Sequence, residues 1–206
     1  MVADINAVRE ALTPYHEKIH GCVLAGFAEW RDMQSYRATR GYAPNLYSRT
    51  NSNDIFDAII RRAIPSLGAE GKVFVKVEAQ TCKFIMGGVV ARIKKAGDDG
   101  LGCNIPTQAA MAFMDADGML PGIPPETAKI ELIWVPNAIW TQVERVLVVA
   151  RDGDRLLWEY EIVADAGEGV ITPLTPTGPN DHSGDDLDGS DLVKPKVKPQ
   201  AKPEKK

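Results

Sequence analysis

The 206-residue sequence has only three cysteines and three histidines. It also has no long apolar run. The cysteines, Cys22, Cys82 and Cys103, are widely spaced and form no Cys-x-x-Cys pair, which disfavours a disulfide framework or a thiolate zinc knuckle. No window approaches the roughly 18 consecutive apolar residues of a membrane-spanning helix, and the first residues lack a signal-peptide pattern. We therefore expect a cytoplasmic protein without a membrane partner.

Motifs of common nucleotide and hydrolase sites are also missing. The sequence contains no G-x-x-x-x-G-K, no G-x-G-x-x-G and no G-x-S-x-G. With 44% hydrophobic and 25% charged residues, the composition is typical of a globular protein. The net charge of −4 disfavours a protein that mainly coats nucleic acid.

The composition changes after Asp165. Residues 166–206 are rich in proline and glycine and contain no aromatic residue, and their acidic residues precede a run of lysines. Such a segment cannot bury enough apolar area to offset the entropy lost on ordering. The sequence therefore predicts a single domain over residues 1–165 and a disordered tail over 166–206, acidic at first and then rich in lysine and proline.

Apolar residues recur at helical spacing in the first third of the chain: Val8, Leu12, Tyr15, Ile19, Val23, Gly26, Trp30 and Met33. Pro14 is expected to interrupt this helix. A second helix is predicted to begin at Asn51 to Asn53 and to end at Pro65, with Arg61 and Arg62 in its last turn.

The period then changes to two, which predicts strands at residues 72–78, 82–86, 89–95, 129–135, 142–151 and 155–163. A short helix is expected over Thr107 to Met114, capped by Asn104. Asp152-Gly153-Asp154 indicates a hairpin between the last two strands. Helices followed by sequential strands predict an α+β fold, in which N-terminal helices pack on a mostly antiparallel β-sheet.

The segment His16-Glu17-Lys18-Ile19-His20 matches H-E-x-x-H. In that motif, two histidines one helical turn apart bind zinc, and the glutamate acts as the base. A third ligand is hard to find, because His182 lies in the tail and Glu29 falls on the opposite helix face. We therefore expect no cofactor. The alternative is a zinc ion bound by His16 and His20, with Glu17 as the base.

Residues 31–62 hold six arginines against three aspartates, interleaved with tyrosines. Arginine beside aromatic residues suits phosphate contact and base stacking, and it equally suits an anchor for a protein partner. A solvated connection without dedicated chemistry would have the same pattern. The candidate residues for binding a partner or an anion are Arg37, Arg40, Tyr42, Tyr47, Arg49, Arg61, Arg62, Lys94 and Lys95.

Two stretches carry a resemblance: ARIKKAGDDGLGCNIPTQ at 91–108, and LPGIP at 120–124 followed by 143–162 with Trp158. Together with Glu29-Trp30 and the helix start at Asn53-Asp54, they resemble an uncharacterised bacterial family over about residues 5–163. Its genes often lie beside those of helix-turn-helix proteins and ImmA/IrrE-type zinc metallopeptidases. The resemblance implies a partner in a bacterial regulatory, toxin–antitoxin or defence module.

The leading interpretation is therefore a non-enzymatic interaction protein that binds a helix-turn-helix or metallopeptidase partner. Two alternatives stay open. One is a zinc-dependent hydrolase that uses the HEKIH segment, and the other is a nucleic-acid-binding protein that uses the Arg/Tyr region 31–62.

Overall fold

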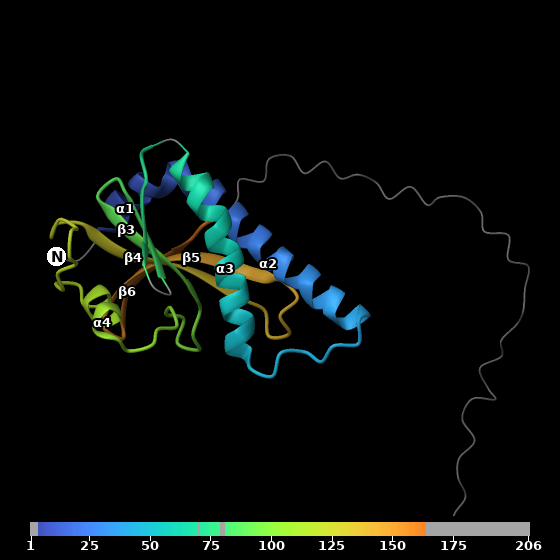
Figure 1. The fold of residues 1–206 in the computed structure, drawn as a ribbon. Helices are drawn as coiled ribbons and strands as arrows, with labels where there is room; N and C mark the ends of the chain where they lie inside the picture. Colours follow the sequence, from blue (N-terminus) through green and yellow to red (C-terminus); the bar gives the residue numbers. More distant parts are fainter. Residues whose placement is uncertain (1–3, 70, 79–80, 164–206) are drawn as a thin grey trace, which may run out of the picture. The chain divides into compact units, whose positions relative to one another are not determined.

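A computed structural model of the chain describes residues 4–69, 71–78 and 81–163 (Figure 1). The predicted tail, 166–206, and its boundary at Asp165 lie outside these residues. The elements in the described part follow one another as α1 (Ile5–Leu12), η1 (Thr13–Tyr15), α2 (His16–Thr39), α3 (Ser48–Gly68), β1 (Phe74–Glu78), β2 (Thr81–Met86), β3 (Val89–Lys95), α4 (Gln108–Met114), β4 (Ala128–Pro136), β5 (Val143–Asp152) and β6 (Arg155–Glu161).

The six strands form one sheet in the order β1-β2-β3-β4-β5-β6. All neighbours are antiparallel except β3 and β4, which run parallel with Ala91 opposite Ile130. A parallel pair needs a long crossover, and residues 96–127, which include α4, supply it. The prediction of an α+β fold with a mostly antiparallel sheet is confirmed.

The helices α1, α2 and α3 cover one face of the sheet (Figure 1). Alternate strand residues such as Phe84, Leu132 and Val148 point to this face and join the main apolar core, as the two-residue period of a strand requires. Within the helical layer, Gly26 of α2 lies against Ile59 of α3. A Cβ atom at position 26 would lie 2.8 Å from the Ile59 backbone nitrogen, so only glycine fits at this approach.

The opposite face of the sheet is covered by the crossover between β3 and β4. Leu101 packs on Ile133, and Phe113 of α4 packs on Val90. Charged side chains are buried under the same segment, with Glu131 placed between two arginines. The crossover therefore encloses a second, smaller and more polar core.

The helix predictions hold in part. Pro14 interrupts the first helix as expected, in the 3-10 turn η1. The second helix begins at Ser48 rather than at Asn51 to Asn53, and it continues through Pro65 to Gly68. The prediction of a stop at Pro65 was wrong because Leu67, one turn after Ala63, is fully buried against the core. Consequently Arg61 and Arg62 lie inside the helix and not in its last turn.

Two smaller expectations also need correction. The cap of α4 is Thr107, whose hydroxyl accepts a hydrogen bond from the Ala110 N–H at 3.2 Å, and not Asn104. Met33, which the sequence predicts to face the core, is 42% exposed, because the C-terminal part of α2 extends beyond the sheet.

The hairpin at Gly153 is confirmed: β5 and β6 pair up to Asp152 and Arg155, with Gly153 at φ 59°.

Candidate functional site

The structure gathers three of the predicted binding residues in one pocket. Arg49 comes from the first turn of α3, and Lys94 and Lys95 come from the end of β3. The pocket has a volume of about 640 Å³, which is within the range of small-ligand sites. We name it the β3-end pocket, and its lining consists of Ser48, Arg49, Ser52, Asn53, Phe56, Asp57, Lys94, Lys95, Cys103, Asn104, Ile105 and Trp134.

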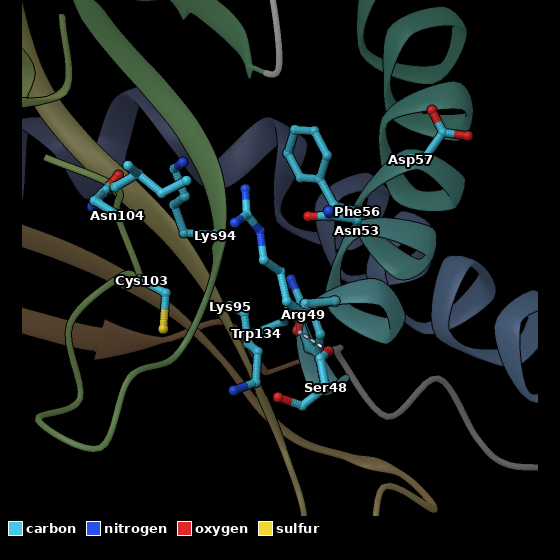
Figure 2. A pocket seen from close by; sticks show the side chains of 12 residues that line it. Ser48, Arg49, Asn53, Phe56, Asp57, Lys94, Lys95, Cys103, Asn104 and Trp134 are labelled. Carbon is cyan, nitrogen blue, oxygen red and sulfur yellow. Dashed lines mark hydrogen bonds between the residues drawn. The ribbon is translucent and has the colours of Figure 1, made fainter. Parts of the chain in front are cut away.

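The pocket follows the end of β3, where that strand extends beyond its neighbour β2. The pairing of β2 with β3 reaches only to Arg92, while β3 continues to Lys95 against β4. Consecutive strand residues point to opposite faces, so Lys94 and Lys95 flank this edge. Figure 2 shows Arg49 extending from α3 toward β3, on the same side as Phe56 and Asn53.

The three cations of the pocket have no acidic partner within ion-pair distance in the described part of the chain. Burial lowers the pKa of Lys94, and the nearby charge of Arg92 lowers it further. The pocket's own carboxylate, Asp57, already accepts a hydrogen bond from Arg61 at 3.0 Å. Among the described residues, the lining of the pocket therefore has more cationic than acidic side chains, and Glu131 acts on Lys94 only from beyond ion-pair distance.

Trp140 fixes the position of Lys95. The Nζ atom of Lys95 lies 5.3 Å from the centre of the Trp140 ring, a cation–π arrangement. Trp140 has a φ of 56°, the left-handed region that a large side chain rarely adopts. Contacts with the rings of Trp30 and Trp134, at 5.7 and 6.2 Å, hold it there.

A buried charge network forms the wall behind Asn104. The Glu131 carboxylate accepts hydrogen bonds from Arg92 at 3.0 Å and from the Gly102 N–H at 3.1 Å, and Arg151 lies 3.4 Å away. The Asn104 amide donates to the same carboxylate at 3.0 Å. Glu131 and the two arginines are each more than nine-tenths buried, so this network attaches the crossover rigidly to the sheet.

The remaining predicted residues divide into two groups. Arg37, Arg40, Tyr42 and Tyr47 belong to residues 36–47, which we name the connection segment because it comprises the last turn of α2 and the link from α2 to α3. Here the Arg37 guanidinium donates to the Ala43 carbonyl at 3.2 Å, and Arg40 lies over the Tyr36 ring. Arg61 and Arg62, in contrast, both bind Glu29 of α2, at 2.8 and 2.7 Å.

The two histidines of the HEKIH segment lie on α2 without a third ligand nearby. The Nε2 atom of His16 is 3.2 Å from the Tyr160 hydroxyl, and burial, followed by the charge of Arg9, lowers the pKa of His16. Within the described ranges, no group of three His, Cys, Asp or Glu side chains could hold a metal ion. The third histidine, His182, lies outside them.

Sequence reasoning missed Glu131 and Trp140. Glu131 interrupts an apolar strand, which by alternation predicts a solvent-facing residue. Its burial depends on the crossover, which is distant in sequence. Trp140 follows Asn137-Ala138-Ile139 in a turn, where nothing in the local pattern indicates a left-handed conformation.

No protein-family model, curated protein or solved structure matches the chain. None of the helices in the described residues combines the length and the apolar character needed to cross a membrane.

Proposed function

We propose that the protein is a non-enzymatic interaction protein that binds a protein partner through the connection segment, residues 36–47. The supporting observation is the exposure of four large side chains within this one segment: Tyr36 (57%), Tyr42 (62%), Leu46 (83%) and Tyr47 (68%). Tyrosine and arginine are the residue types that dominate the energy of protein interfaces. The segment supplies both types beside each other.

The arginines of the connection segment indicate the charge of the partner. Arg40 donates a hydrogen bond to the Tyr36 hydroxyl at 3.2 Å, and Arg37 is held by the Ala43 carbonyl. Within the described part of the chain, neither guanidinium group has a carboxylate within ion-pair distance. A partner with an acidic surface fits this segment, because complementary charge favours encounter and fixes orientation.

The class of partner follows from the family resemblance alone. We propose a helix-turn-helix protein or a zinc metallopeptidase, acting with this protein in a bacterial regulatory, toxin–antitoxin or defence module. The three cysteines are unpaired, which suits the reducing cytoplasm. With a metallopeptidase partner the metal site belongs to that partner, so His16 and His20 need not carry zinc.

Site-specific photo-cross-linking in the native host tests the proposal. A photoreactive phenylalanine analogue replaces Tyr42 in one variant and Met119 in the other. Met119 is a matched control, because at 77% it is at least as exposed as Tyr42 at 62% but belongs to the crossover. The Tyr42 variant is expected to form one discrete cross-linked product, identified by mass spectrometry, and the Met119 variant should not form it.

The outcomes separate the interface from the identity of the module. The same product from both variants, or none from Tyr42, rejects the connection segment as the interface. A discrete product that contains a protein of another class would support the connection segment as the interface. It would contradict the assignment of the partner as a helix-turn-helix protein or a metallopeptidase. The product should weaken when Arg37 and Arg40 are both replaced by glutamine.

The nucleic-acid alternative keeps one supporting observation, which is that Arg37, Arg40 and Arg49 have no carboxylate within ion-pair distance among the residues that the structure describes. It predicts binding to single-stranded or duplex nucleic acid that weakens steeply with salt. Because Glu29 already binds Arg61 and Arg62, we expect substitution of these two residues to matter little. The zinc alternative predicts stoichiometric metal in the purified protein, lost in His16→Ala.

A further inference from the structure

The β3-end pocket has a chemistry that the partner interface does not use. Its cations come from two elements that are distant in sequence, the start of α3 and the end of β3. A solvated charged face needs neither convergence nor a cavity. Here Arg49, Lys94 and Lys95 border one pocket that is open to solvent on one side.

We infer that the β3-end pocket binds a small molecule with at least two anionic groups, of the size of a diphosphate. Lys95 and Arg49 offer donors on the helical side of the β3 edge, and Lys94 offers donors on the other side. An arginine fork and lysine ammonium groups are the donors that proteins use for phosphate and carboxylate oxygens. In a ligand with two anionic groups joined by a short bridge, one group would bind Arg49 and Lys95 and the other would bind Lys94.

The electrostatics of the pocket support this assignment. The pKa of Lys94 is lowered because the side chain is partly buried, and Arg92 adds like charge. An anion beside Lys94 would remove this penalty. The first turn of α3 adds to the positive potential, because it contains no acidic residue and no side-chain cap.

The pocket is also preorganised for binding. Lys95 is held over the Trp140 ring, and the left-handed backbone of Trp140 is maintained by packing between Trp30 and Trp134. Strained backbone of this kind is found preferentially at ligand sites. On the opposite wall, the bond from Asn104 to the buried Glu131 fixes the loop at residues 103–105. Little side-chain entropy is then lost when an anion binds.

The volume favours a small ligand over a nucleic-acid strand. A pocket of about 640 Å³ accommodates a single small molecule, a diphosphate included. A polymer would need a cationic track that continues along the surface. On α3 the next arginines, Arg61 and Arg62, are bound to Glu29 instead, so the positive charge does not continue along that helix.

The test is an NMR titration of the full-length ¹⁵N-labelled protein with pyrophosphate and, separately, with citrate, at constant ionic strength. We expect saturable shifts at residues 48–57, 94–95 and 103–105 for at least one of the two, with a Kd of about 1 mM or tighter. The two arms show whether phosphate or carboxylate oxygens are recognised. A 20-nucleotide single-stranded RNA is the third arm.

Charge-removing variants localise the site. Arg49→Gln and Lys94→Gln should each weaken binding about tenfold, the effect of losing one charge-assisted hydrogen bond. Arg155→Gln is the matched control, since Arg155 is an exposed arginine of β6 outside the pocket, and its Kd should not change. Arg49 is itself exposed, so its replacement leaves the core intact, which circular dichroism verifies.

Three results overturn the inference. These are the absence of saturable shifts with both small anions, an equal Kd in the wild type and in both pocket variants, and binding of RNA without binding of either small anion. None of them bears on the cross-linking at Tyr42, so the pocket and the partner interface can fail separately.

Discussion

At the residue scale, Gly26 sets the distance between α2 and α3. We expect Gly26→Ala to lower the free energy of unfolding by about 1–3 kcal/mol. The added Cβ would meet Ile59 backbone atoms at 2.8 and 2.9 Å, so a whole helix must move. Urea denaturation followed by circular dichroism measures the change.

Gly21 is the matched control in the same helix. A Cβ there meets nothing within 4 Å, and alanine is favoured over glycine inside a helix by about 0.5–1 kcal/mol. Gly21→Ala should therefore stabilise the protein. Similar effects of the two substitutions would show that helix propensity, and not the contact with Ile59, decides the result.

Glu131 is the second residue with a large expected effect. Replacing it by glutamine leaves Arg92 buried without an ion-pair partner and leaves Arg151 with the exposed Asp154 alone, at 3.1 Å, which should cost about 3–5 kcal/mol of unfolding free energy. Glu29→Gln removes a carboxylate that also binds two arginines, but on the surface. That change should cost less than about 1 kcal/mol, because exposed ion pairs contribute little.

Comparable losses of unfolding free energy in these two glutamine variants, measured by urea denaturation, would contradict the structural role of the buried network.

At this scale, sequence reasoning identifies residues but not the contacts between them. The cations Arg49, Lys94 and Lys95 could be named from composition and spacing alone. Their convergence, and the burial of Glu131, depend on contacts between distant segments.

At the element scale, α3 passes through Pro65 against the usual rule. The proline ring removes the hydrogen bond to the Arg61 carbonyl and clashes with it. Because Pro65 is exposed, Pro65→Ala should raise the free energy of unfolding by about 1–3 kcal/mol. Thermal unfolding would show a higher midpoint.

Pro44 in the connection segment provides the opposite case. It lies outside any helix, so Pro44→Ala only adds freedom to the unfolded chain and should lower stability by about 0.4–1 kcal/mol. A destabilising effect of Pro65→Ala would mean that the proline contributes packing which outweighs its cost to the helix.

The types of the elements were largely readable from the sequence, whereas some of their ends and pairings were not. All six strands were located, because runs rich in β-branched and apolar residues are bounded by turn residues; the central strands β3, β4 and β5 are buried on both faces and do not alternate in burial. The stop expected at Pro65 failed, because burial of Leu67 outweighs a local rule. The parallel pairing of β3 with β4 was also missed, since antiparallel order is the default for sequential strands.

At the scale of the whole molecule, one apolar cluster joins Val8 of α1 to Ile162 just after β6. Trp30 and Trp134 belong to this cluster, and Trp140 and Trp158 pack against it. We therefore expect a single cooperative unfolding transition, in which tryptophan fluorescence and far-ultraviolet circular dichroism have the same midpoint. Two separated midpoints would mean that the helical layer and the sheet unfold independently.

The crossover at residues 96–127 has a consequence for how such a protein can diversify. This one uninterrupted stretch supplies the loop wall of the β3-end pocket, covers the second face and contributes no residue to the main core. Apart from Leu101, Gly102, Asn104 and Phe113, which contact the sheet, its sequence and length can therefore change, in evolution or by grafting, while the helices and strands keep their packing. Two chains of this architecture could then share a scaffold and differ in ligand preference.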